Sequence, residues 1–125
     1  MSRVIHFEIS VDNPEKAKKF YQTVFGWKIE KWGPVEYWLI ETGKKSEPGI
    51  DGALRKRSDD EELKNENTIN TIGVPSIDEF MRKVEENGGK ILMPKQAIPG
   101  IGYFTYCKDP EGNAFGIMEA DSSAK

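Results

Sequence analysis

The feature that most constrains this chain is an order of predicted elements that occurs twice. In the first half, the alternating strand VIHFEISV (4–11) is followed by a helical pattern and then by three strand-like runs. The second half restarts with the strand TINTIGV (68–74) and shows the same order. Gly26 and Gly89, which follow the two predicted helices, are 63 residues apart. The sequence therefore predicts a duplicated βαβββ unit, so that strand residues can be compared between the halves.

Both predicted helices carry recognisable end signals. Asn13 can cap the first helix, Pro14 suits its first position, and Gly26 can end it. Ser76 and Glu79 have the spacing of a capping box at the start of the second helix. The apolar stripes expected to face the core are Ala17, Phe20, Tyr21 and Val24 in the first helix, and Ile77, Phe80, Met81 and Val84 in the second.

Strand-like runs and turn residues complete the predicted organisation. A tight turn is expected at Gly33 and Pro34, and DPEG, before the last strand, has the pattern of a type I turn. The chain is expected to be a single domain (1–125), with module one at 1–57, a polar connector at 58–67, module two at 68–120 and a tail at 121–125. The remaining predicted strands are WKIEKW (27–32), EYWLIETG (36–43), GIDGALRKR (49–57), KILMP (90–94), GYFTYCK (102–108) and NAFGIME (113–119).

Composition argues against several classes of function. The formal net charge is −3, from 18 basic and 21 acidic residues, so we expect no nucleic-acid partner. No apolar run approaches the roughly 20 residues that cross a bilayer, and the first residues lack the pattern of a signal peptide, so we expect no membrane partner. One cysteine, Cys107, cannot form an internal disulfide, which favours the cytoplasm. We expect its thiol to be buried.

Three stretches of the sequence carry a resemblance to a known family. HFEISVDNPEKAKKFYQTVFGW, PSIDEFMRKVEENGG and YCKDPEGNAFGIME resemble the vicinal oxygen chelate superfamily, which includes glyoxalase I, extradiol dioxygenases and bleomycin resistance proteins. The resemblance implies an α+β fold of two tandem βαβββ modules that form curved sheets around a cavity. It also implies a small-molecule ligand and a homodimer, since many members of the superfamily are dimers.

In metal-dependent members of the superfamily, the first and last strand of each module supply one ligand each to a divalent metal. These positions map onto His6, Gly52, Ile69 and Gly116, of which only His6 can bind a metal. We therefore expect no cofactor. The alternative is a divalent metal held by unmapped residues such as Asp51 and Asn70, which adjoin two of the mapped positions.

The candidate site residues follow from these positions and from strand alternation. His6 and Glu8 share one face of their strand, so they could act as acid and base or could satisfy each other. Aromatic residues crowd several strands, and alternation places about half of them toward the cavity. The predicted ligand-binding residues are His6, Trp38, Gly52, Ile69, Tyr103 and Gly116.

Three functions remain open from the sequence. The favoured one is a metal-free binder of a small, partly aromatic or carbonyl-containing molecule. The second is a glyoxalase- or dioxygenase-type enzyme whose metal is held by unmapped ligands. The third is a metal-free enzyme that uses His6 and Glu8 as acid and base. An enzyme would be lyase- or isomerase-like or dioxygenase-like, and the mapped positions argue against a standard glyoxalase I.

Overall fold

The computed structural model describes residues 2–125 and divides into two compact units. The first unit is His6–Ile69, and the second is Asn70–Lys125 together with Met1–Ile5. None of the helices in the described part of the chain is long and apolar enough to cross a membrane. The two units are described separately below.

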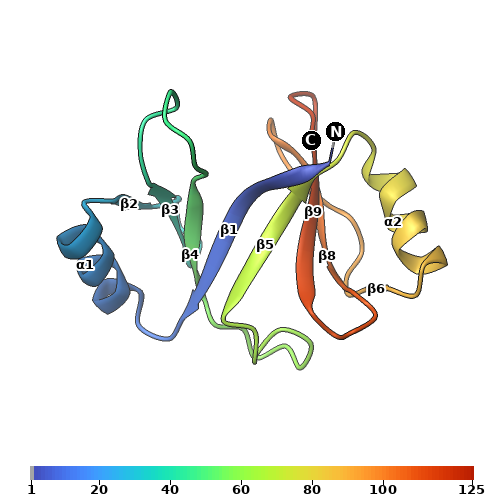
Figure 1. Ribbon diagram of the computed structural model, residues 1–125, viewed down its shortest axis with the longest axis horizontal. Helices are drawn as coiled ribbons and strands as arrows, with labels where there is room; N and C mark the ends of the chain where they lie inside the picture. Colours follow the sequence, from blue (N-terminus) through green and yellow to red (C-terminus); the bar gives the residue numbers. More distant parts are fainter. Residues whose placement is uncertain (1) are drawn as a thin grey trace. The chain divides into compact units, whose positions relative to one another are not determined.

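The first unit contains one helix and a mixed sheet (Figure 1). The strand order is β2-β3-β4-β1, in which β1 and β4 are parallel and the other neighbours antiparallel. The elements are β1 (Arg3–Val11), which belongs to this unit from His6 onward, α1 (Pro14–Phe25), β2 (Lys28–Lys31), β3 (Tyr37–Glu41) and β4 (Gly52–Lys56).

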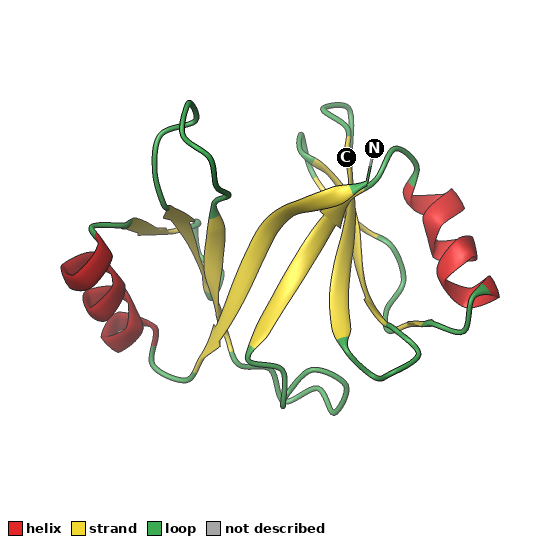
Figure 2. Cartoon of the chain, in the orientation of Figure 1, coloured by secondary structure: helices red, strands yellow, loops and turns green. Residues whose placement is uncertain are grey.

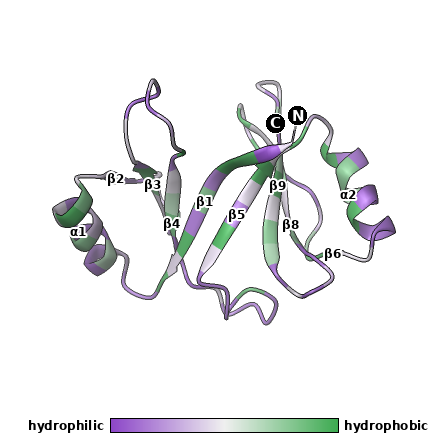
Figure 3. Ribbon diagram, viewed as in Figure 1, coloured by the Kyte–Doolittle hydropathy of each residue, from purple (hydrophilic) through white to green (hydrophobic). Residues whose placement is uncertain are grey.

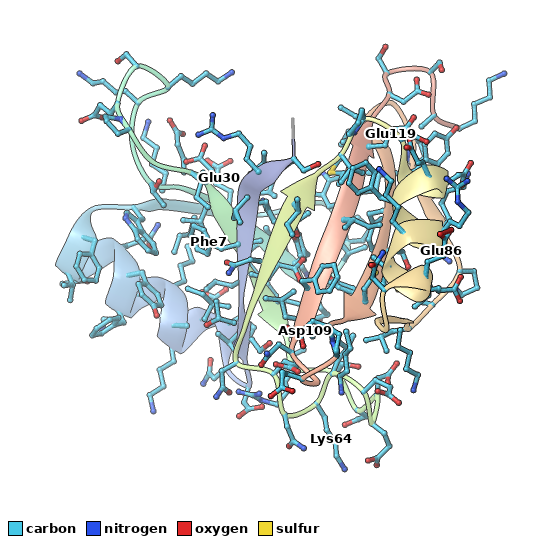
Figure 4. The ribbon with its side chains drawn as sticks, turned by 45° about the vertical axis from the view of Figure 1, so that its right-hand side comes forward. Phe7, Glu30, Lys64, Glu86, Asp109 and Glu119 are labelled. Carbon is cyan, nitrogen blue, oxygen red and sulfur yellow. The ribbon has the colours of Figure 1, made fainter. Side chains whose placement is uncertain are left out.

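Alternation along the strands of the first unit sends one set of side chains toward α1. Phe7 and Ile9 pack against buried Val11, Trp38 and Ile40 in the core of this unit. Phe7 is labelled on the α1 side of β1 in Figure 4. The intervening residues of β1, which begin with the only histidine, therefore face the other side of the sheet.

The ends of α1 form as the sequence predicts. The side chain of Asn13 accepts a hydrogen bond from the Lys16 backbone N–H at 3.1 Å, and Pro14 occupies the first turn. Gly26 ends the helix with φ 73°, in the left-handed region that glycine adopts without a Cβ penalty. Its N–H donates to the Gln22 carbonyl at 3.0 Å, which satisfies one of the last orphan carbonyls.

The second unit repeats the plan with one additional strand (Figure 2). The strand order is β5-β9-β8-β6, with β5 and β9 parallel, and β7 pairs antiparallel with β8. Buried Val74, Ile77, Cys107 and Ile117 form its core. The elements are β5 (Thr68–Gly73), which belongs to this unit from Asn70 onward, α2 (Ile77–Glu86), β6 (Lys90–Ile91), β7 (Gln96–Ile98), β8 (Gly102–Lys108) and β9 (Ala114–Ala120).

The start of α2 is capped differently from the predicted capping box. The Ser76 hydroxyl accepts from the Glu79 N–H at 3.3 Å, as predicted. Glu79, however, forms an ion pair with Lys83, and it is Glu119 of β9 that accepts from the Ile77 N–H at 2.9 Å. Glu119 is labelled beside the start of α2 in Figure 4. Apolar and polar residues alternate around α2 (Figure 3), as its predicted stripe requires.

The thiol of Cys107 belongs to the core of the second unit. Its side chain is fully buried, and burial, aided by the charge of Glu85, raises the pKa of the thiol to about 11. The cysteine is therefore a protonated, apolar core residue at neutral pH, as the sequence predicts.

The α+β class and the repeated βαβββ order are confirmed, with differences in the second half. The predicted strand 90–94 is confined to β6, and β7 was not predicted as a strand. Pro94 and Pro99 flank β7, and proline argues against a strand in a sequence pattern. The predicted tail (121–125) is packed, since Ala124 is buried and its carbonyl accepts from the Gly100 N–H at 2.9 Å.

The strand register corrects one step of the mapping between the halves. Glu8 lies opposite Ala53 across the β1–β4 pair, and Thr71 lies opposite Gly116 across the β5–β9 pair. The offset of 63 residues that relates Glu8 to Thr71 therefore also relates Ala53 to Gly116. Gly52 lies opposite Phe7, one residue away. The structural counterpart of Gly116 is Ala53, so the alignment of Gly52 with Gly116 was wrong by one residue.

Gly52 is required for close packing, and its replacement by alanine is expected to destabilise the protein by about 1–3 kcal/mol. A Cβ at this position would meet the Phe7 carbonyl oxygen and lie 2.7 Å from the Phe7 ring. Gly116→Ala is the matched control, because the three atoms nearest to its Cβ all belong to the Thr71 side chain, the closest at 3.0 Å. Urea unfolding of both variants measures the difference. Equal midpoints for Gly52→Ala and wild type would contradict this packing argument.

Candidate functional site

A cluster of polar side chains lies on the sheet face of the first unit that points away from α1. We call it the polar cluster: His6, Glu8 and Ser10 of β1, Tyr37 of β3 and Arg55 of β4. The three β1 residues share a face because successive strand residues point to opposite sides. Tyr37 and Arg55 lie opposite each other across the antiparallel β3–β4 pair, so both join this face.

Short contacts connect the whole polar cluster. The Tyr37 hydroxyl donates to Glu8 Oε2 at 2.7 Å, and His6 Nε2 lies 2.7 Å from the same hydroxyl oxygen. Arg55 Nε lies 3.3 Å from Glu8 Oε1. The Arg55 Nη2 group donates to the Ser10 hydroxyl at 2.9 Å. Glu8 is therefore the centre of the cluster, with Tyr37 on one carboxylate oxygen and Arg55 on the other.

The charges of the polar cluster are largely removed from water. Glu8 is 5% exposed, and the Arg55 side chain is 11% exposed. Taking both charges out of water costs several kcal/mol per ion, which their attraction and hydrogen bonds must repay. Removal of either charged member is therefore expected to destabilise the protein, because the other charge stays buried without its partner in the cluster.

The imidazole of His6 is half-buried and neutral at pH 7. Burial lowers its pKa below the ordinary value of 6.5, although the negative charges of Glu8 and Asp51 act in the opposite direction. A neutral imidazole has one N–H donor and one nitrogen lone pair, so His6 can donate through one ring nitrogen and accept through the other.

Because the pKa of His6 is lowered in the folded state, stability is expected to fall as the pH drops from 7 below 6.5. In that interval the unfolded chain binds a proton that folded His6 does not, so acid favours unfolding. Because His6 is the only histidine, a single substitution shows whether this change of stability with pH comes from its imidazole. Urea midpoints at pH 7.5 and 5.5 measure it, and His6→Ile should lose this part of the slope. An unchanged slope in His6→Ile would contradict the assignment.

The structure places the predicted site residues in different surroundings. His6 and Glu8 are brought together, joined through Tyr37. Trp38 is 6% exposed and packs on the α1 side of the sheet, away from the polar cluster. Tyr103 packs against the core that α2 covers, with the Lys95 ammonium 5.1 Å from its ring centre. A ligand contact of Trp38 or Tyr103 remains a prediction.

The other predicted ligand-binding residues are small or apolar. Ile69 is fully buried. Gly116 is buried, and its missing side chain would point at Thr71, whereas that of Gly52 would point at Phe7. The positions therefore carry no polar group, and their role in binding remains a prediction.

Sequence reasoning did not select Ser10, Tyr37 or Arg55 as site residues. The usable signal was the period of two in β3, where buried Trp38 and Ile40 imply that Tyr37 faces the other side. Leu39 is apolar as well, so the pattern YWLI does not show from sequence which face is the core. The pairing of Arg55 with Glu8 depends on the β1–β4 register, which no local pattern encodes.

The residues at the superfamily's metal-ligand positions do not fit a metal. After correction of the register these positions hold His6, Ala53, Ile69 and Gly116, so one of the four has a donor atom. Asp51 accepts instead from the Thr42 N–H at 2.9 Å. Within residues 2–125, no group of three or more His, Cys, Asp or Glu side chains is arranged to hold a metal ion.

The fold and the order of elements agree with one protein family. The model of the glyoxalase/bleomycin resistance protein/dioxygenase superfamily matches residues 3–117. The chain belongs to this superfamily. No curated protein matches the chain.

Solved structures share the fold at low sequence identity. A methylmalonyl-CoA epimerase in complex with methylmalonyl-CoA and NH4+ is 13% identical, with a TM-score of 0.71 over 100% of this chain and 99% of that one. A methylmalonyl-CoA epimerase from Mycobacterium tuberculosis is 12% identical, with a TM-score of 0.69 over 94% and 87%. A structure described as NAD-dependent benzaldehyde dehydrogenase from Legionella pneumophila is 20% identical, with a TM-score of 0.65 over 93% and 98%. These likenesses support the fold alone.

Proposed function

We propose that this protein is a metal-free binder of a small, partly aromatic or carbonyl-containing molecule, which it contacts through the polar cluster. The observation that carries the proposal is an asymmetry between the two halves of the duplicated fold. One half has the polar cluster, and the other has the same strands without it.

Comparison with the second half shows whether the fold requires polar residues at the positions of the polar cluster. At the offset of 63 residues, Ile69, Thr71 and Gly73 of β5 correspond to the three β1 members of the polar cluster, and Met118 of β9 corresponds to Arg55. The second unit thus forms the same parallel strand pair with neutral residues. A buried ion pair is weak evidence for stability, since apolar replacements are often as stable or more so. The polar cluster is better explained by ligand binding.

Apolar side chains adjoin the polar cluster and suit an aromatic ligand. Trp32 is 41% exposed, and its ring meets Tyr37 edge-to-face with centroids 6.1 Å apart. Leu39, two residues from Tyr37 on the same face of β3, is 43% exposed. A few placed polar groups with apolar walls are the usual composition of a small-molecule site.

A thermal-shift screen of small aromatic and carbonyl compounds on chelator-treated protein tests the proposal. A ligand at 100 times its dissociation constant should stabilise the protein by about 2.7 kcal/mol. Acyl compounds belong in the screen, since one protein of the same fold holds methylmalonyl-CoA. Binding should be lost in the double variant Glu8→Thr/Arg55→Met. Retained binding in that variant, or binding only after a divalent metal is added, would overturn the proposal.

A second candidate function is metal-free acid–base catalysis on a small carbonyl compound. It is favoured by the hydrogen-bonded series His6–Tyr37–Glu8, in which a neutral imidazole is available as a base. Proton exchange of a bound carbonyl compound in deuterated water, followed by NMR, distinguishes turnover from binding. Binding without exchange favours the first function.

The expected assembly and compartment are part of the proposal. We expect one domain per chain, a homodimer, and a cytoplasmic protein. Light scattering coupled to gel filtration tests the dimer, and a monomeric mass across the micromolar range would contradict it.

A further inference from the structure

We propose that Nδ1 of His6 is the ligand-facing atom of the polar cluster and acts as a hydrogen-bond acceptor, so that the ligand carries an O–H or N–H donor. Tyr37 is a positioning residue in this arrangement, because it acts through His6. This inference rests on the proposed function and names the chemistry of the ligand.

The direction of the hydrogen bonds identifies the acceptor atom. Tyr37 has one hydroxyl proton, and it donates this proton to Glu8 at 2.7 Å. The hydroxyl oxygen can then only accept from His6 Nε2, which is also 2.7 Å away. Nε2 must therefore carry the proton of the neutral imidazole. The lone pair is left on Nδ1.

Contacts on the far side of Glu8 maintain this direction. The reverse arrangement needs a protonated Glu8 that donates to Tyr37. Arg55 Nε, at 3.3 Å from the other oxygen, forms an ion pair with Glu8. Arg55 is itself oriented by its hydrogen bond to Ser10. The series from Ser10 to His6 thus has one consistent set of proton positions.

The surroundings of Nδ1 fit a donor group on the ligand. In the described part of the chain, the only hydrogen bond found for the His6 side chain is the one through Nε2, and the imidazole is half-buried. The charged groups that act on the pKa of His6 are Glu8 of β1 and Asp51, which precedes β4. A ligand O–H or N–H group would find a hydrogen-bond acceptor at Nδ1.

Nitrogen-15 NMR of the imidazole tests the proton positions directly, because His6 is the only histidine. At pH 7.5 the full-length protein should show a single neutral imidazole with the proton on Nε2 and a free lone pair on Nδ1. Tyr37→Phe keeps the ring but removes the hydroxyl, and it should shift the tautomer ratio and the imidazole titration. A dominant Nδ1–H tautomer in the wild type, or an unchanged spectrum in Tyr37→Phe, would overturn the inference.

A matched pair of ligands tests the donor requirement. 2-Naphthol and 2-methoxynaphthalene have the same rings, and only the first has a hydroxyl donor. We expect about tenfold tighter binding of 2-naphthol, from one hydrogen bond, and loss of this preference in His6→Ile. Equal affinities would overturn the inference and leave the proposed function in place. If no screened compound binds, the proposed function fails, and the NMR spectrum still decides the proton positions.

Discussion

Replacement of Glu8 by threonine is expected to destabilise the protein by about 3–5 kcal/mol, the cost of breaking a buried ion pair. The variant removes the carboxylate that Arg55 and Tyr37 both contact. Arg55, whose side chain is 11% exposed, would keep its charge without this partner. Threonine is chosen because Thr71 occupies the equivalent position of the second half. Urea unfolding at pH 7.5 measures the loss.

The double variant Glu8→Thr/Arg55→Met is the matched control. It gives the β1–β4 pair the residues that the second half has at Thr71 and Met118. Because neither charge then remains, we expect most of the lost stability to return, with a coupling of 0.5–3 kcal/mol, roughly the range for residues in contact. Arg55→Met alone completes the set of variants. If the double variant loses as much stability as Glu8→Thr and Arg55→Met together, the polar cluster is needed for folding. That result would remove the main support for a ligand-binding role.

Replacement of Trp38 by alanine is expected to cost about 3–5 kcal/mol, the range for deletion of a large aromatic side chain from a core. Trp38 is 6% exposed and packs with Ile29, Ile40 and Leu54 on the α1 side of the sheet. Its removal leaves a cavity between the sheet and α1. Denaturant unfolding at neutral pH measures the effect.

Trp32→Ala is the control for Trp38→Ala, since the same side chain is deleted from an exposed position. We expect a stability change within about 0.5 kcal/mol, with weaker binding of any aromatic ligand found in the screen. A Trp38→Ala variant that stays stable but loses ligand would restore Trp38 as the binding residue. The pair of variants thus separates the packing tryptophan from the one beside the polar cluster.

The sequence by itself determined the architecture. The helix ends follow from local chemistry, since Asn13, Gly26 and Ser76 act on backbone groups within a few residues. The duplication is visible because both halves keep the same spacing between strand and helix. The prediction that Cys107 is buried was made because the sequence places no basic residue other than Lys108 beside it, and it is confirmed. The sequence also placed His6 and Glu8 on one face of β1, because strand alternation is a local property.

The tertiary structure decided which other residues join them. Tyr37 lies 31 positions from His6, and Arg55 lies 45 positions from Ser10. Their contacts depend on how β3 and β4 align with β1, and a shift of one residue reverses every side chain. For the same reason, matching Gly52 to Gly116 by sequence gave an alignment that was off by one. The hydrogen-bond register of a sheet is set by pairing between distant segments. This register places Tyr37, and not Trp38, on the face of the polar cluster, which the pattern YWLI could not show.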